Sequence, residues 1–241
     1  MEPTWSKQIN GQQDPRSEKQ WFIKPTWLVR LGRPTASRFL SLFTNITLTG
    51  TKNLPPTGPF ILAANHVSMV DSIILNALLP RYPFFMAKSE LFSNPAMAWF
   101  LRHAGAFPVY RGARDQWALQ QAMRILEAGQ VLGIYPEGTR SKEQGRLGKA
   151  KTGAVRLALA QQVPIVPVAI TGSAALLKLK RNLLRSIPIH VHIGELFDVC
   201  NRVSEHTPSN ETIRALSTEL MVRIARMLPP EKRGMYAHLV S

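Results

Sequence analysis

Short apolar runs alternate with amphipathic segments between residues 46 and 200. Ile46 and Leu48 alternate with polar residues, as in a half-buried strand, whereas residues 60–64 and 84–87 are continuous apolar runs typical of buried strands. Further extended segments are expected at 106–110, 131–135, 163–170 and 189–193. Helical patterns occupy 72–79, 94–103, 116–127, 153–160 and 211–228. This alternation predicts the α/β class: a single domain with a mixed, largely parallel central sheet flanked by helices.

Two prolines interrupt the expected strand at 163–170. Pro164 and Pro167 lack the backbone N–H that a sheet ladder uses. We therefore expect this strand at an edge of the sheet, or the prolines at a strand end.

The first 45 residues have a different character. Residues 1–20 are polar, and we expect a disordered tail there without a signal peptide. Over residues 21–45, aromatic and aliphatic side chains are interleaved with Lys and Arg, and Pro25 and Pro34 divide the segment. We expect a short N-terminal helix pair, at roughly 25–32 and 35–44. Its pattern suits a membrane interface and an ordinary helical hairpin equally well. A second amphipathic segment at 176–185 suits a membrane contact and a plain surface helix equally well.

Composition and charge narrow the function classes. The chain has 241 residues and a net charge of +15, from 30 Lys and Arg against 15 Asp and Glu. Such a basic chain is expected to meet anionic partners: nucleic acid, anionic lipid or phosphorylated substrates. Cys200 is the single cysteine, which excludes an internal disulfide and a multi-thiolate zinc site, and we expect no metal. No stretch approaches the ~18 apolar residues of a membrane span, so we expect a cytoplasmic protein with peripheral membrane contact.

A candidate acid–base pair follows the apolar run at 60–64. His66 comes just after that run, and Asp71 lies five residues further on, where a helix is expected to begin. A loop-to-helix transition would let the carboxylate bond one imidazole nitrogen, which leaves the other nitrogen as a base. The alternative is a surface histidine beside a helix-capping aspartate. Ser68 lacks the G-x-S-x-G context of a nucleophile, so we interpret it as a structural hydroxyl.

Candidate anion-binding groups follow two other strands. Arg111 comes at the end of the 106–110 segment, and Glu137-Gly138-Thr139-Arg140 follows the run at 131–135. Glycine allows close backbone approach, and an arginine offers a bidentate fork for phosphate. The spacing of a Walker P-loop and the G-x-G-x-x-G pattern are absent, so nucleotide-phosphate binding is not favoured.

In order and spacing, these motifs resemble the glycerolipid acyltransferase family, and within it the 1-acylglycerol-3-phosphate (lysophosphatidic acid) acyltransferases of bacterial and plastid type. The resemblance rests on Asn65-His66-x-x-x-x-Asp71, Gly105 to Arg111, Glu137-Gly-Thr-Arg140, Val163-Pro-Ile-Val-Pro167, Lys88-x-Glu-Leu-Phe92 and Lys151-x-Gly-Ala154. It implies that residues 46–241 form an acyltransferase domain.

The resemblance also implies a reaction. A fatty acyl group would pass from acyl-CoA or acyl-carrier protein to the free hydroxyl of lysophosphatidic acid, giving phosphatidic acid without any cofactor. His66 would be the general base and Asp71 would orient it. The acceptor phosphate would be bound among Arg111, Glu137, Gly138, Thr139 and Arg140, with Asn65, Ser68, Lys88 and Lys151 as additional site residues. The protein would associate peripherally with the cytoplasmic face of an anionic membrane.

Two alternatives remain open at this point. The acceptor could be another lysophospholipid, glycerol-3-phosphate or a glycolipid, because the motifs handle a hydroxyl and a phosphate and not the whole acceptor. A basic nucleic-acid-binding module would explain the charge, but it leaves His66 to Arg140 without a role and shows no reader motif, so we expect no nucleic acid partner.

Overall fold

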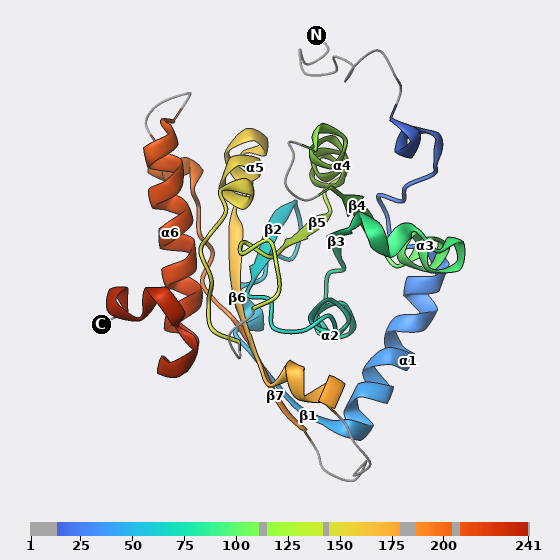
Figure 1. The fold of residues 1–241 in the computed structure, drawn as a ribbon, viewed down its shortest axis with the longest axis horizontal. Coiled ribbons are helices and arrows are strands. Elements are labelled where there is room, and N and C mark those ends of the chain that lie inside the picture. The colour runs from blue at the N-terminus through green and yellow to red at the C-terminus, as the bar shows by residue number, and fades with distance from the viewer. Residues whose placement is uncertain (1–13, 111–114, 142–144, 179–186, 204–207, 241) are drawn as a thin grey trace.

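The computed structural model describes residues 14–110, 115–141, 145–178, 187–203 and 208–240. Within these ranges one mixed sheet of seven strands has the order β1-β7-β6-β2-β5-β3-β4 (Figure 1). The strands are β1 (Thr44–Thr49), β2 (Phe60–Ala64), β3 (Pro83–Lys88), β4 (Ala106–Val109), β5 (Val131–Ile134), β6 (Ile165–Thr171) and β7 (Ile187–Ile193). The α-helices are α1 (Trp27–Phe43), α2 (Asp71–Leu78), α3 (Pro95–His103), α4 (Gln116–Glu127), α5 (Gly153–Gln161) and α6 (Asn210–Arg226).

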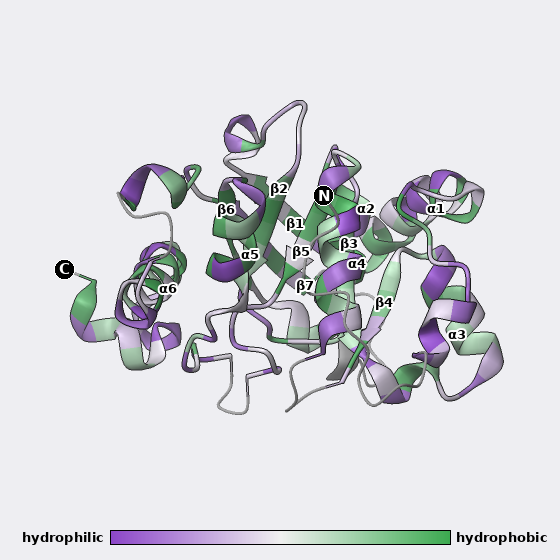
Figure 2. Cartoon of the chain, turned by 90° about the horizontal axis from the view of Figure 1, so that it is seen from above, coloured by the Kyte–Doolittle hydropathy of each residue, from purple (hydrophilic) through white to green (hydrophobic). Residues whose placement is uncertain are grey.

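Helices cover both faces of the sheet. Helices α4, α5 and α6 pack on one face and α2 on the other, with α1 beside α2 (Figure 1). All five residues of β2 are buried: Phe60 and Leu62 belong to the core under α2, and Ile61 and Ala63 to the core under the other three helices. A strand that is covered on both faces must be apolar at every position, and the central strands β2 and β6 are accordingly green in Figure 2. The predicted single α/β domain with a mixed, largely parallel sheet is confirmed.

The sheet topology brings two loops to the same edge. Strands β6, β2, β5, β3 and β4 run parallel, whereas β7 is antiparallel to β6. Because β2 and β5 are neighbours, with Ala63 opposite Ile134, the loops that leave their carboxyl ends lie side by side. Functional side chains are expected at such an edge.

The expected edge position of the proline-containing strand was wrong, because β6 lies inside the sheet between β7 and β2. Pro164 does lie at a strand end, since β6 begins at Ile165, whereas Pro167 lies within the strand. The carbonyl of Pro167 accepts the N–H of Gly194 (2.8 Å). The nitrogen and carbonyl of one strand residue point to the same side, so the Pro167 nitrogen faces the position where β7 has just ended at Ile193. The ladder between β6 and β2 therefore loses no hydrogen bond, and the proline is accommodated in a central strand.

The expected helix pair is one continuous helix, α1, with Pro34 inside it. Pro34 and Arg30 are both exposed, so the Arg30 carbonyl that loses its helical partner can be solvated by water. The guanidinium of Arg33 donates to the carbonyl of Leu79 just beyond α2, which fastens the proline-containing turn to its neighbour. Packing thus overrides the local tendency of proline to divide the helix.

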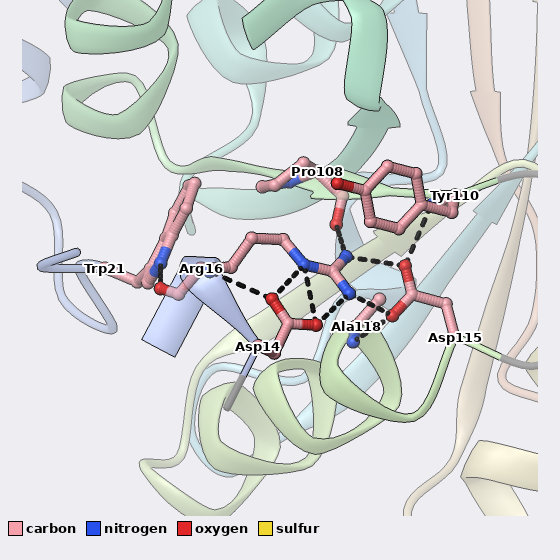
Figure 3. Close-up of polar contacts among 7 residues, drawn as sticks. All are labelled: Asp14, Arg16, Trp21, Pro108, Tyr110, Asp115 and Ala118. Atoms are coloured by element: carbon pink, nitrogen blue, oxygen red, sulfur yellow. Dashed lines mark hydrogen bonds and ion pairs between the residues drawn. The ribbon is translucent and has the colours of Figure 1, made fainter. Parts of the chain in front are cut away.

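Residues 14–20 correct the expectation of a disordered tail, while residues 1–13 lie outside the described ranges. Pro15–Glu18 form a 3-10 helix that Asp14 caps, and Arg16 is buried (8% exposed). Figure 3 shows the Arg16 side chain between Asp14 and Asp115. The contact with Asp14 is local, but the burial of Arg16 also depends on the carboxylate of Asp115, which is 99 residues away along the chain and gives no local sign.

No helix within the described residues is long and apolar enough to cross a bilayer. Most of the amphipathic segment at 176–185 lies outside the described residues, whose last element before the gap is the 3-10 helix Ser173–Lys178.

Candidate active site

The structure brings the two predicted acid–base residues together. β2 ends at Ala64, and a loop over residues 65–70 leads to α2, which Asp71 begins. Nδ1 of His66 lies 2.9 Å from Oδ2 of Asp71, and the Asp71 side chain is fully buried. Because a carboxylate only accepts hydrogen bonds, Nδ1 carries the proton in this pair and Nε2 is left as the basic nitrogen. The five-residue spacing is therefore compatible with a dyad.

The loop wraps around the Asp71 carboxylate. The same Oδ2 accepts the backbone N–H groups of Val67 and Ser68, each at 2.8 Å. The other oxygen, Oδ1, is buried without a hydrogen-bond partner among the described residues. Asp71 thus fixes both the loop and the imidazole through one oxygen atom, and its charge lies where an imidazolium would form.

Tyr135 supplies a flat surface for the imidazole. The two rings stack with their centroids 3.9 Å apart and an interplanar angle of 14°. Burial, followed by the nearby charge of Asp71, raises the pKa of the Tyr135 phenol well above its usual value, so the ring stays neutral. Its hydroxyl lies 2.8 Å from the Ser72 hydroxyl at the start of α2. Neither Tyr135 nor Ser72 was predicted as part of the site. The only sign in the sequence was an aromatic residue at the end of the apolar run at 131–135.

Glu137 ties the neighbouring loops to one another. Its Oε1 accepts the backbone N–H of His66 (3.0 Å), and its Oε2 accepts the N–H of Gly148 (2.8 Å). Burial raises the pKa of this carboxyl group, while the two backbone N–H groups act in the opposite direction. The carboxylate, 5% exposed as a residue, is therefore occupied by the chain itself.

A segment near the C-terminus holds the stretch that contains Gly148. The hydroxyl of Tyr236 accepts the N–H of Ala150 (2.9 Å), and the carbonyl of Lys232 accepts the N–H of Leu147 (3.0 Å). Tyr236 is itself buried (4% exposed). The last helical turns of the chain thereby support the loop that bonds Glu137.

Gly138 shows why glycine follows Glu137. Its φ of +69° lies in the left-handed region, and an added Cβ would lie 2.8 Å from Cδ and Cε of Lys151. The N–H of Lys151 is bonded to the carbonyl of Pro136 at 2.8 Å. Glycine at this point therefore lets Lys151 lie directly across the turn.

Two cavities adjoin these residues. The first, of about 510 Å³, is lined by His66 and Tyr135 and then mostly by apolar side chains: Met69, Met86, Leu91, Val109, Leu119 and Ile134. The second, of about 840 Å³, is lined by the cations Arg140, Arg146, Lys149 and Lys151 together with Glu137 and Glu231. Arg140 and Lys151 line both cavities. An apolar space and a cationic space therefore meet beside the imidazole.

The other predicted site residues have varied surroundings. Asn65 is buried and exchanges two hydrogen bonds with the backbone of Ile170 (2.7 and 2.9 Å), which continues the pairing of β2 with β6. Lys88 lines the apolar cavity and pairs with Glu90 (2.7 Å). Ser68 is buried, whereas Thr139 is exposed and lines the cationic cavity. Arg111 lies outside the described residues.

Comparison with known proteins gives consistent matches. A family model described as "Acyltransferase" matches residues 45–171. A 1-acyl-sn-glycerol-3-phosphate acyltransferase of Bacillus subtilis is 32% identical over 189 residues, which cover 78% of this chain and 90% of that protein. A chloroplastic 1-acyl-sn-glycerol-3-phosphate acyltransferase of Arabidopsis thaliana is 33% identical over 68% of this chain and 44% of its own length. The crystal structure of the lysophosphatidic acid acyltransferase PlsC from Thermotoga maritima superposes with a TM-score of 0.62 at 27% identity, covering 80% of this chain and 76% of that one.

Proposed function

The chain belongs to the acyltransferase family, and from this premise we propose that it transfers a fatty acyl group from a thioester donor to the free hydroxyl of 1-acylglycerol-3-phosphate, giving phosphatidic acid. The observation that carries the proposal is the His66–Asp71 dyad at the junction of an apolar and a cationic cavity. Such a junction suits a reaction between an alkyl thioester and a phosphorylated alcohol. The similarity to the Bacillus subtilis enzyme supports the choice of acceptor.

The geometry supports direct transfer with His66 as general base. Nε2 takes the proton of the acceptor hydroxyl while the hydroxyl oxygen attacks the thioester carbonyl carbon. The tetrahedral intermediate then breaks its C–S bond, and the departing thiolate takes the proton from the imidazolium. Asp71, held at 2.9 Å from Nδ1, stabilises the imidazolium between the two steps. No covalent acyl-enzyme forms, so no side-chain nucleophile is required.

Arg140 and Lys151 are our choice for the acceptor phosphate. Both line the apolar and the cationic cavity, so a phosphate between them would hold its lipid near His66. An arginine fork adds bidentate geometry to the charge. Glu137 is assigned to positioning, because its carboxylate oxygens already accept two backbone N–H groups and a carboxylate repels phosphate. Arg111 stays a proposed contributor on the basis of its motif alone.

Two apolar surfaces are assigned to the acyl donor and to the membrane. The acyl chain of acyl-CoA or acyl-carrier protein is proposed to lie in the apolar cavity. Helix α1 carries Trp27, Leu31, Phe39 and Leu42 at 60–70% exposure, opposite the side that buries Val29 and Leu40. This exposed apolar stripe, on a chain of net charge +15, suits peripheral contact with an anionic membrane surface in the cytoplasm.

The test is product identification with defined substrates. Purified protein is incubated with acyl-CoA or acyl-carrier protein and, in separate reactions, with lysophosphatidic acid, another lysophospholipid or glycerol-3-phosphate. Mass spectrometry should detect phosphatidic acid, and a His66→Ala sample controls for contaminating activity. Products only from another acceptor would move the proposal to that acceptor, and no acyl transfer to any of them would refute it.

A further inference from the structure

Arg16 is a buried cation far from the dyad in sequence, and the proposed chemistry gives it no role. Its guanidinium contacts two carboxylates: Nη2 lies 2.6 Å from Oδ2 of Asp14, and Nη1 lies 2.6 Å from Oδ2 of Asp115. Nη1 also approaches the carbonyl of Pro108 at 3.4 Å. Figure 3 shows this arrangement, in which one side chain from the N-terminal segment reaches the end of β4 and the start of α4.

Aromatic rings complete the enclosure. The guanidinium carbon lies 4.4 Å from the centroid of the Tyr110 ring and 4.5 Å from that of Trp117. Trp21 donates its indole N–H to the carbonyl of Arg16 (2.7 Å) and packs edge-on against Trp117. Burial opposes the charge of Arg16, but the two carboxylates outweigh it and raise the pKa of the guanidinium. Arg16 is thus a permanent, fixed cation.

Asp115 links this cation to the apolar cavity. Val109 at the end of β4 and Tyr110 next to it line that cavity, together with Asp115 at the N-terminal cap of α4 and Leu119 in its first turns. Among the described lining residues, Asp115 is the only carboxylic acid, and its side chain is 4% exposed. Its carboxylate caps α4 through the N–H of Ala118 (3.0 Å) and accepts the N–H of Tyr110 (2.8 Å). A buried charge in such a wall is costly unless it is paired.

We propose that Arg16 is a positioning residue that neutralises Asp115 from behind the cavity wall, and thereby keeps the wall suited to an alkyl chain. The inference rests on the proposed function, because it takes the cavity as the place of the acyl group. Without the guanidinium, the Asp115 carboxylate would have no neutralising cation. It would then place a bare negative charge beside the bound alkyl chain and draw water to the cavity wall. Affinity for an alkyl ligand would then fall, although no atom of Arg16 touches the ligand.

The test asks whether the positive charge of Arg16 or the hydrogen-bond geometry of its guanidinium controls binding of an alkyl ligand. Arg16→Lys keeps the cation and loses the planar fork, whereas Arg16→Gln loses both. Arg16→Gln/Asp115→Asn removes the cation and the carboxylate together. Asp14→Asn is the control, since Asp14 bonds the same guanidinium but does not line the cavity. Calorimetry measures binding of a hexadecyl thioether of phosphopantetheine, the part that acyl-CoA and acyl-carrier protein share, so that no turnover is needed.

Charge neutralisation predicts a specific order of affinities. Arg16→Gln should bind the hexadecyl ligand about tenfold more weakly than the unaltered protein, the usual scale for an unpaired buried polar group. Arg16→Lys, Asp14→Asn and the double variant should each bind the hexadecyl ligand with most of the affinity of the unaltered protein. Equal losses in Arg16→Lys and Arg16→Gln, or a double variant no better than Arg16→Gln, would overturn the proposal.

The proposal can still be tested if some of these variants fail to fold. If Arg16→Gln fails to fold while the double variant folds, the unpaired carboxylate is the cause, which supports the proposal. If both fail to fold, Arg16→Lys decides: a folded Lys variant with a tenfold loss of affinity would overturn it. Failure of the proposed function is separately visible, because the unaltered protein would then not bind the hexadecyl ligand at all.

Discussion

The carboxylate of Glu137 is the most informative place to perturb the site. It accepts the N–H of His66 through Oε1 and that of Gly148 through Oε2, at 3.0 and 2.8 Å. Glu137→Gln keeps the shape but exchanges one acceptor oxygen for an NH₂ group. Whichever way the amide is turned, one backbone N–H then faces another donor. Leaving one buried N–H without an acceptor costs ~1–3 kcal/mol, so we expect the free energy of unfolding to fall by about that amount.

The kinetic consequence should fall on the chemical step. The hydrogen bond from the His66 backbone N–H to Glu137 helps to position the imidazole beside Asp71. Its loss should therefore displace the imidazole, and kcat should decrease about tenfold or more, as is usual when a catalytic group is displaced. The KM for the acceptor should change little, because Glu137 is not assigned to the phosphate. Urea unfolding and steady-state kinetics with each substrate varied in turn measure both effects.

Glu231→Gln is the matched control. Glu231 also lines the cationic cavity but is exposed, so the same chemical change there should alter neither stability nor kcat. Unchanged unfolding of Glu137→Gln together with a higher acceptor KM would refute the reasoning. It would mean that the carboxylate acts on the acceptor and not on the chain.

Three further outcomes are expected. Arg140→Ala should lower acceptor efficiency by ~10- to 100-fold, the loss of a charge-assisted contact, with Arg140→Lys less affected and the donor KM unchanged; a defect in the donor KM alone would move Arg140 to the donor phosphates. Gly138→Ala should lower the unfolding free energy by ~1–3 kcal/mol through its positive φ, as chemical denaturation would show; unchanged stability would contradict the backbone argument. Trp27→Ser with Leu31→Ser should reduce sedimentation with anionic vesicles; equal sedimentation would exclude α1 as the membrane contact.

The sequence predicted those parts of the structure that depend on local pattern. The apolar run at 60–64 became β2, and the residues after it became the loop that holds His66 beside Asp71. The strand follows from its continuous apolar run, which is typical of a strand buried on both faces. The loop follows from the carboxylate of Asp71, a residue type that often marks the start of a helix. The order and spacing of the motifs also indicated the family.

Long-range contacts account for what the sequence missed. Arg16 reads as one charge in a polar tail, because its partner Asp115 lies 99 residues further along the chain. Tyr135 reads as the last residue of an apolar run, and only the pairing of β2 with β5 places it against the imidazole. The single helix α1 is a third case, since the contact between Arg33 and the end of α2 offsets the effect of Pro34. Each depends on packing that periodicity does not encode.

The central claim is that His66 removes the proton from the acceptor hydroxyl. The most direct measurement is the rate of acyl transfer to lysophosphatidic acid at saturating substrates for His66→Ala, in protein shown to be folded and to bind the alkyl ligand normally. The dyad geometry predicts a rate lower by at least the ~10²–10⁴-fold that a general base contributes. A folded His66→Ala variant that transfers acyl groups at close to the rate of the unaltered protein would contradict the claim.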